Sequence, residues 1–353
     1  MGNNVKDLRA LTIEELTSVV ESIGEKRFRA SQLYDWIHNK RVDNFEDMKN
    51  IPKSLVKLLG EEYSVYPVRI EEKLISQIDG TRKYLMRLHD DNIIECVLMR
   101  YEYGNSVCIS SQVGCRMGCK FCASTIDGLA RNLTAGEMVG QIYAIMADIG
   151  EQVGHVVIMG SGEPMDNYDE VIRFLKNITD EKGQNLSGRN ITLSTCGLVP
   201  GILKLAEEKL QLTLAISLHA TTDEKRRRIM PIANKYSIGE ITDACRTYFE
   251  KTGRRLTFEY SLIAGVNDSE EDAKELADIA GGLKAHVNLI PVNPIKERNY
   301  VSTDRDRVLA FKNKLEKKHI NVTIRREMGR DINGACGQLR RTFITTPKGE
   351  DKC

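Results

Sequence analysis

Six apolar runs alternate with amphipathic segments in the second half of this chain, and this alternation constrains the fold more than any other feature. Segments such as 135–150 and 269–283 carry helical periodicity between the runs. Strand–helix units that repeat at roughly 25 to 35 residues are typical of a parallel sheet or barrel. Six units fall short of an eight-fold barrel, so the chain is predicted to be α/β with a partial (β/α)6 TIM-type barrel. The runs are residues 155–160, 190–197, 212–220, 255–265, 285–293 and 321–327.

The chain has 353 residues, and its other parts show different patterns. Near the N-terminus, Thr12 and Glu15 form a capping-box pair ahead of an apolar helical stripe. Further on, polar and apolar residues alternate as in β-strands. The predicted units are an N-terminal helical accessory domain at 1–62, a β-rich linker at 63–100, the barrel at 101–330 and a C-terminal tail with an active-site loop at 331–353.

Composition indicates a cytosolic protein with a local affinity for anions. No apolar run reaches transmembrane length, and the N-terminus has no apolar signal region. Nine cysteines in such a chain argue against a disulfide framework and for metal binding or catalysis. The net charge is only +1, but the basic residues cluster, which favours an anionic partner. The clusters are 225–228, Arg254 with Arg255, Arg325 and Arg326 with Arg330, and Arg340 with Arg341.

Three cysteines, Cys115, Cys119 and Cys122, lie close together at C-x3-C-x2-C spacing. A structural zinc needs four ligands, and Cys108, seven residues upstream, is poorly spaced to be the fourth. An iron–sulfur cluster is normally held by four thiolates, so three leave one iron open to a substrate. The loop, with Phe121 before its third cysteine, resembles the radical S-adenosylmethionine (SAM) superfamily. This resemblance implies one [4Fe-4S] cluster whose open iron chelates SAM, and zinc remains the alternative.

Polar residues follow several of the predicted strands, where active groups of β/α barrels lie. The segment 161–164 looks like the glycine-rich GEP segment of the superfamily, although Ser161 stands where other members often have Met. A lone polar residue at a strand end is usually a cap, but several beside a SAM-type cluster are expected to form a cofactor wall. The resemblance assigns SAM binding to Gly162, Glu163, Ser194, Ser217, Leu218, His219 and Asn293.

A more specific resemblance covers nearly the whole chain. The segments "ACGQL" at 335–339 and "RNLTAGEMVGQI" at 131–142, together with Cys108, are similar to those of the dual-specificity RNA adenine methyltransferases. That family methylates carbon 2 of one adenine in 23S ribosomal RNA and of the adenine 3′ to the tRNA anticodon, at position 37. It uses two SAM molecules per turnover.

The resemblance also implies roles for three further residues. Cys336 would take a methyl group from one SAM as S-methylcysteine, and its methylene radical would then add to the adenine. Glu95 would remove the ring proton as general base. Cys108 would attack the sulfur of Cys336, release the methylated base and leave a Cys108–Cys336 disulfide. Four cysteines match no catalytic position and are interpreted as buried or incidental: Cys96, Cys196, Cys245 and Cys353.

The same resemblance implies partners: 23S rRNA, tRNA, a flavodoxin or ferredoxin as electron donor, and a thiol reductant. The N-terminal helical domain at 1–62 and the basic clusters are expected to form the RNA-contacting surface. We expect a monomer with no membrane contact. A sister enzyme that methylates carbon 8 tends to have Ala-Thr-Gly after the third cluster cysteine, whereas this chain has Ala123, Ser124 and Thr125, which favours carbon 2. Two other readings remain: another radical SAM enzyme, such as a glycyl-radical activase, and a non-enzymatic cluster or zinc protein.

Overall fold

The computed structural model describes residues 5–339, and its centre is one ten-stranded mixed sheet. Seven strands are parallel, in the order β6, β9, β10, β11, β12, β13 and β14. Strands β14 and β3 are its two edges. The parallel strands are β6 (Gly104–Ile109), β9 (His155–Ile158), β10 (Ile191–Thr195), β11 (Thr213–Ser217), β12 (Leu256–Leu262), β13 (His286–Pro291) and β14 (Val322–Ile324).

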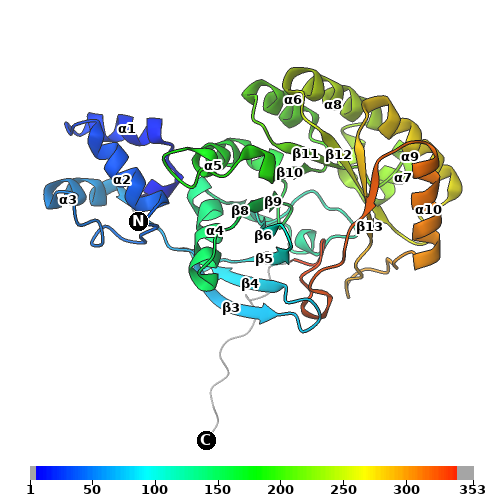
Figure 1. The fold of residues 1–353 in the computed structure, drawn as a ribbon, viewed down its shortest axis with the longest axis horizontal. Coiled ribbons are helices and arrows are strands. Elements are labelled where there is room, and N and C mark those ends of the chain that lie inside the picture. The colour runs from blue at the N-terminus through cyan, green and yellow to red at the C-terminus, as the bar shows by residue number, and fades with distance from the viewer. Residues whose placement is uncertain (1–4, 340–353) are drawn as a thin grey trace, which may run out of the picture.

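Helices follow the parallel strands along the chain and cover one face of the sheet, as Figure 1 shows. Their apolar sides and the strands form the largest hydrophobic core. The six predicted strands are confirmed as β9 to β14, and β6 is an additional parallel strand ahead of them, so the strand–helix units run from β6 to β13 and β14 closes the series. The helices are α4 (Ala135–Ile149), α5 (Tyr168–Thr179), α6 (Val199–Glu208), α7 (Asp223–Ile229), α8 (Ile238–Thr252), α9 (Glu270–Leu283) and α10 (Arg305–Lys317).

Beyond β6, three antiparallel strands extend the same sheet to its second edge. They are β3 (Arg69–Ile75), β4 (Arg82–Arg87) and β5 (Ile93–Tyr101), and β5 pairs with β6. The segment predicted to be β-rich thus continues the barrel sheet. A small ribbon of β7 (Gln112–Gly114) and β8 (Leu129–Asn132) flanks the cysteine loop.

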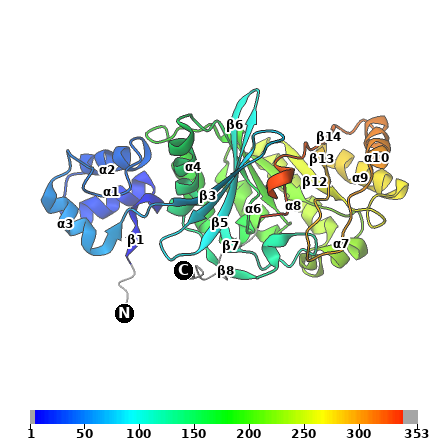
Figure 2. The same cartoon turned by 90° about the horizontal axis from the view of Figure 1, so that it is seen from below.

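The N-terminal helices form a bundle with its own apolar core, set to one side of the sheet in Figure 2. The predicted capping box of Thr12 and Glu15 is present. The helices are α1 (Ile13–Ser22), α2 (Phe28–His38) and α3 (Lys53–Glu62), and the short strands β1 (Lys6–Asp7) and β2 (Tyr63–Ser64) pair beside them.

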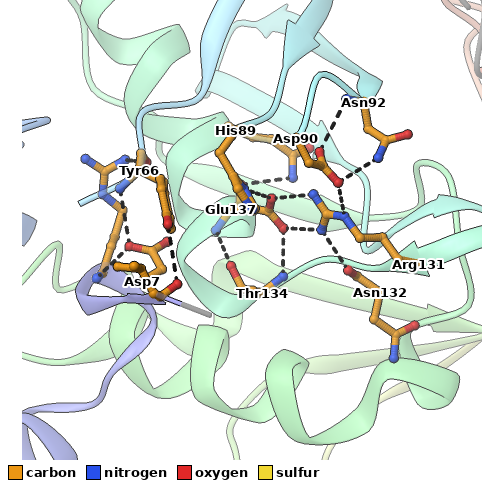
Figure 3. Close-up of polar contacts among 12 residues, drawn as sticks. Asp7, Tyr66, His89, Asp90, Asn92, Arg131, Asn132, Thr134 and Glu137 are labelled. Carbon is orange, nitrogen blue, oxygen red and sulfur yellow. Dashed lines mark hydrogen bonds and ion pairs between the residues drawn. The ribbon is translucent and has the colours of Figure 1, made fainter. Parts of the chain in front are cut away.

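A polar network ties this bundle to the start of α4 (Figure 3). Tyr66, which follows the bundle, stacks on His89 with ring centroids 4.4 Å apart. His89 in turn contacts the buried carboxylate of Glu137 at 3.2 Å, and Arg131 holds both carboxylate oxygens of Glu137 at 2.7 and 2.8 Å. Because Glu137 also completes the capping box of α4 with Thr134, the network fixes the helix that follows the cysteine loop.

None of the helices in the described part of the chain is both long and apolar enough to cross a membrane.

Candidate active site

One cavity lies at the carboxyl ends of the parallel strands and brings together most of the predicted site residues. The cysteine loop, the strand ends and the tail all contribute to its wall. The predicted site residues that line it are Cys115, Cys119, Cys122, Gly162, Glu163, Ser194, Ser217, His219, Asn293 and Cys336. Leu218 is fully buried and is not among the lining residues.

The cysteine loop has a backbone that only its glycines allow. Gly114 has a φ of +77°, and a Cβ there would lie 2.0 Å from the carbonyl oxygen of Gly128. Thr125 holds the other end, where its hydroxyl donates to the carbonyls of Cys119 and Cys122 at 3.0 Å each. The three thiols are thus presented to one cavity by a short loop that is braced at both ends.

The arrangement of the thiols fits a cluster better than a single ion. Among residues 5–339, no three Cys, His, Asp or Glu side chains converge as the ligands of one metal ion do. A [4Fe-4S] cluster binds its thiolates at separate irons, so its ligands surround a cavity instead of meeting at a point. Cys115, Cys119 and Cys122 line the cavity in this way.

Glu163 braces the GEP segment from within. Its carboxylate accepts the backbone N–H of Met165 at 3.0 Å and that of Cys196 at 2.7 Å. Burial raises the pKa of Glu163, although these hydrogen bonds oppose the shift. Gly162 packs so closely that a Cβ would lie 2.7 Å from the side chains of Ser111 and Gln112. The segment therefore places backbone, more than side chain, against the cavity.

On the opposite wall, His219 is held in one neutral form. Its Nδ1 accepts the backbone N–H of Ser261 at 2.9 Å, which leaves the proton on Nε2. Burial, followed by the charge of Arg226, lowers the pKa of His219 to about 3. The edge of its ring meets Phe121 of the cysteine loop, with centroids 5.0 Å apart. Beside it, the hydroxyls of Ser194 and Ser217 lie 3.4 Å apart.

Residues 329–339, here called the tail segment, carry Cys336, which lines the cavity together with Gly337 and Leu339. Asn293 donates to the carbonyl of Cys336 at 3.0 Å. Two contacts join the segment to the cysteine loop: Gly337 accepts the N–H of Ala123 at 2.8 Å, and Leu339 accepts the hydroxyl of Ser124 at 2.8 Å. Cys336 is thereby held at the wall that the cluster cysteines form.

The start of the tail segment is anchored on the β3–β4 hairpin, beside which the red tail lies in Figure 1. Asp331 accepts the hydroxyl of Ser76 at 2.7 Å and the N–H of Gln77 at 2.9 Å. Asp79 accepts the N–H of Gly329 at 3.0 Å. The rest of the predicted tail, including Cys353, lies outside the described residues.

Cys336 also faces a second, smaller cavity that it shares with Cys108. Both thiols are free. Cys108 is buried on β6, and burial raises its pKa to about 12, against the opposing charge of Arg325. Cys336 is open to the cavities, but the surrounding protein still raises the pKa of its thiol, again opposed by Arg325. The two predicted reaction partners thus line the same cavity.

Glu95 lies on β5 beneath the tail segment and is 1% exposed. Its carboxylate forms an ion pair with Lys83 of β4 at 2.9 Å. It lines neither of the two cavities that contain Cys336.

Two charged residues of the site had no role in the sequence-based prediction. Arg325 was assigned to a basic surface cluster, but it lines both cavities of Cys336, and Glu259 of β12 lies 3.9 Å from it. Arg226 was also assigned to such a cluster, and this is wrong: it is fully buried and donates to the carbonyls of Cys196 and Leu218 at 2.6 and 3.2 Å. Sequence clustering finds the charges but cannot tell which ones point inward.

Comparison with known proteins defines first the class of enzyme. The model of the radical SAM superfamily matches residues 109–277. A crystal structure of a radical SAM methyltransferase from Sphaerobacter thermophilus superposes with a TM-score of 0.89 at 42% identity, over 95% of this chain and 99% of that one. The fold is that of a radical SAM enzyme, whose cofactors are a [4Fe-4S] cluster and SAM.

The family within this class follows from relatives that match nearly the whole chain. The model of the ribosomal RNA large subunit methyltransferase N-terminal domain matches residues 6–65. Proteins named probable dual-specificity RNA methyltransferase RlmN from Lachnospira eligens and Clostridium perfringens are 58% and 55% identical. Each match covers 96% of this chain, and 97% and 98% of the respective relative. The chain belongs to the family of dual-specificity RNA methyltransferases RlmN.

Proposed function

We propose that this protein methylates carbon 2 of one adenine in 23S rRNA and of adenine 37 in tRNA, with Cys336 as the carrier of the methyl group. One observation supports this most directly: Cys336 borders both the cavity of the cluster cysteines and the cavity of Cys108. A thiol in that position can take a methyl group on one side and be attacked on the other.

In the first step, the Cys336 thiolate attacks the methyl carbon of SAM, the C–S bond of SAM breaks, and S-adenosylhomocysteine leaves. The cavity wall would hold SAM through Gly162, Glu163, Ser194, Ser217, Leu218, His219 and Asn293. Leu218 can take part only through its backbone, because its side chain is buried away from the cavity. Neutral His219 offers an Nε2–H donor, because its Nδ1 accepts the N–H of Ser261.

Cys115, Cys119 and Cys122 would hold the cluster at the cavity wall. When bound, the cluster would supply the electron that cleaves a second SAM to methionine and a 5′-deoxyadenosyl radical, and would take one electron back when the RNA adduct is oxidised. The S-methyl group of Cys336 would give up one hydrogen atom to that radical, which becomes 5′-deoxyadenosine, and its methylene carbon would then bond to carbon 2 of the adenine.

Release uses two residues of the sheet. Glu95 takes the proton from carbon 2, which restores the aromatic ring once the adduct has lost one electron. The Cys108 thiolate then attacks the sulfur of Cys336, the S–CH2 bond breaks with its electron pair on the base, and a proton completes the methyl group. The Cys108–Cys336 disulfide must be reduced by an external thiol before the next turnover.

The proposed partners follow from these needs. The target adenine must be turned out of its RNA to reach the cavity. Exposed Arg116, Lys120, Arg227 and Arg228 lie on and beside the cysteine loop, where RNA phosphates could bind. The electron would come from a flavodoxin or ferredoxin. We further propose a cytoplasmic monomer divided as expected from the sequence, at 1–62, 63–100, 101–330 and 331–353.

Product analysis tests the proposal. The reconstituted enzyme is incubated with SAM, a low-potential reductant and either 23S rRNA or tRNA, and the RNA is digested to nucleosides for mass spectrometry. We expect 2-methyladenosine from both RNAs. Finding 8-methyladenosine would assign the carbon-8 activity instead, and no methylated adenosine from either RNA would contradict the proposal.

A further inference from the structure

The ion pair of Lys83 and Glu95 is buried beneath the tail segment. The two side chains are 7% and 1% exposed, and their charged atoms lie 2.9 Å apart. Lys83 pairs with Val97 in the β4–β5 ladder. Val97 belongs to a small apolar cluster that includes Cys108 and Leu339. The pair therefore lies on the side of the sheet where the tail segment packs.

Lys83 also contacts the tail segment itself. Its Nζ donates to the carbonyl of Asn333 at 3.3 Å, three residues before Cys336. Asn333 has a φ of +49°, a left-handed backbone at the turn that leads into the cysteine. One ammonium group thus joins the candidate base to the segment that carries the methyl group.

A buried ion pair is a poor device for stability alone. The free-energy cost of removing two charges from water often exceeds the attraction between them. Apolar residues of similar size in their place often give the same stability or more. Here the pair has a third polar partner, the carbonyl of Asn333 on the tail segment, which points to a role in function. Glu95 is also closed off in this arrangement, so the tail segment and Lys83 control how the base meets its substrate.

We propose that Lys83 is a positioning residue for proton removal, which holds the Glu95 carboxylate and the tail segment in a fixed position relative to each other. This inference rests on the proposed function, in which Glu95 takes the proton of the RNA adduct. In that step the proton passes from carbon 2 to a carboxylate oxygen of Glu95, while Lys83 keeps its own protons. Neutralising Glu95 weakens its contact with Lys83, so the tail is loosened as Cys108 begins its attack.

The proposal separates two steps that can be measured independently. Methylation of Cys336 by SAM does not involve Glu95, whereas resolution of the RNA adduct does. In Lys83→Met we expect Cys336 methylation within about twofold of the parent, and product release slowed by roughly ten- to a hundredfold, the range of general-base effects. The covalent RNA–protein species should accumulate on denaturing gels. Lys83→Arg, which keeps the charge, should recover part of the rate.

Lys73→Met is the matched control. Lys73 lies on the same hairpin and pairs with Asp148 at 2.7 Å, but Asp148 belongs to α4 on the other side of the sheet. This variant should behave as the parent. Equal effects of Lys73→Met and Lys83→Met, or loss of Cys336 methylation in Lys83→Met, would overturn the proposal. If Lys83→Met does not fold, Lys83→Gln, which keeps a donor without the charge, is tested for the same adduct.

A Glu95→Gln variant tests the role of Glu95 separately from that of Lys83. If it accumulates the adduct and Lys83→Met does not, only the role of Lys83 is wrong. If Glu95→Gln releases product at the parental rate, the base is not Glu95, and the roles of both residues are overturned.

Discussion

The two sides of the candidate active site are built in different ways. The barrel wall presents the ends of parallel strands and a glycine-braced loop, so its side chains follow from local pattern. The tail segment has almost no regular structure and is held by a few hydrogen bonds to the β3–β4 hairpin, the cysteine loop and Asn293. A cofactor needs a fixed wall, whereas a thiol with two successive partners needs a segment that can be released.

The largest expected loss of activity comes from removing one cysteine of the barrel wall or one of the tail segment, and iron content distinguishes the two. Cys119→Ala and Cys336→Ala should each lower RNA methylation by about 10³-fold or more, as expected when a cofactor ligand or a nucleophile is removed. Only Cys119→Ala should lose iron. Iron content and 2-methyladenosine are measured on both. A Cys336→Ala enzyme that lacks iron would show that the tail is part of the cluster site, and the comparison would fail.

A smaller effect is expected where wall and tail meet, at Arg325. Its charge lowers the pKa of Cys336, which burial raises. In Arg325→Met that pKa should rise further, so less thiolate is present at pH 7. Loss of one charge contact of about 1.4 kcal/mol would slow Cys336 methylation roughly tenfold.

Varying the pH tests whether Arg325→Met slows Cys336 methylation through a raised pKa of the thiol. Raising the pH should restore the rate of Arg325→Met, because the thiolate then forms without help. Arg330→Met, an exposed cation of the tail segment, is the control and should match the parent. A rate for Arg325→Met that stays low and flat up to pH 9 would mean that the arginine acts through structure and not through charge.

Loosening the tail at its anchor should cost less. Asp331→Ala removes two hydrogen bonds, a part-buried one from the hydroxyl of Ser76 and an exposed one from the N–H of Gln77, and a single hydrogen bond adds little net stability. We expect RNA methylation to fall about three- to fivefold, with iron content and SAM binding unchanged. Glu316→Ala, which removes an ion pair with Lys312 within α10 and no contact of the tail segment, serves as control. If SAM binding fell as well, the tail would be contributing to the cofactor wall.

The smallest effect is expected at a cysteine outside both regions. Cys245 is fully buried in α8 and takes no part in either cavity. Cys245→Ala should leave RNA methylation unchanged and lower the free energy of unfolding by about 1 kcal/mol, the cost of a small cavity. Urea denaturation and the nucleoside assay test this. A loss of activity without a loss of stability would show that a functional cysteine was overlooked.

The same contrast between barrel wall and tail segment explains how much of the fold and of the site could be predicted from the sequence. The strand–helix alternation and the cysteine spacing are local signals: the first correctly predicted the barrel, and the second singled out three cysteines that line one cavity. Lys83 is 250 residues from its partner Asn333, so no local pattern could have pointed to it. Charge clustering also misplaced Arg226, because sequence does not show that buried carbonyls accept the hydrogen bonds of a cation. For Cys336, Cys108 and Glu95 only the family resemblance indicated a role.

The central claim is that Cys336 carries the methyl group, and mass spectrometry of its peptide tests this most directly. Enzyme with its cluster intact is purified without oxygen, incubated with SAM and digested. The account predicts an added methyl group on Cys336, which is lost on incubation with RNA and reductant. An unmodified Cys336 after incubation with SAM would contradict it, and the protein would then be a radical SAM enzyme that uses this cysteine in another way.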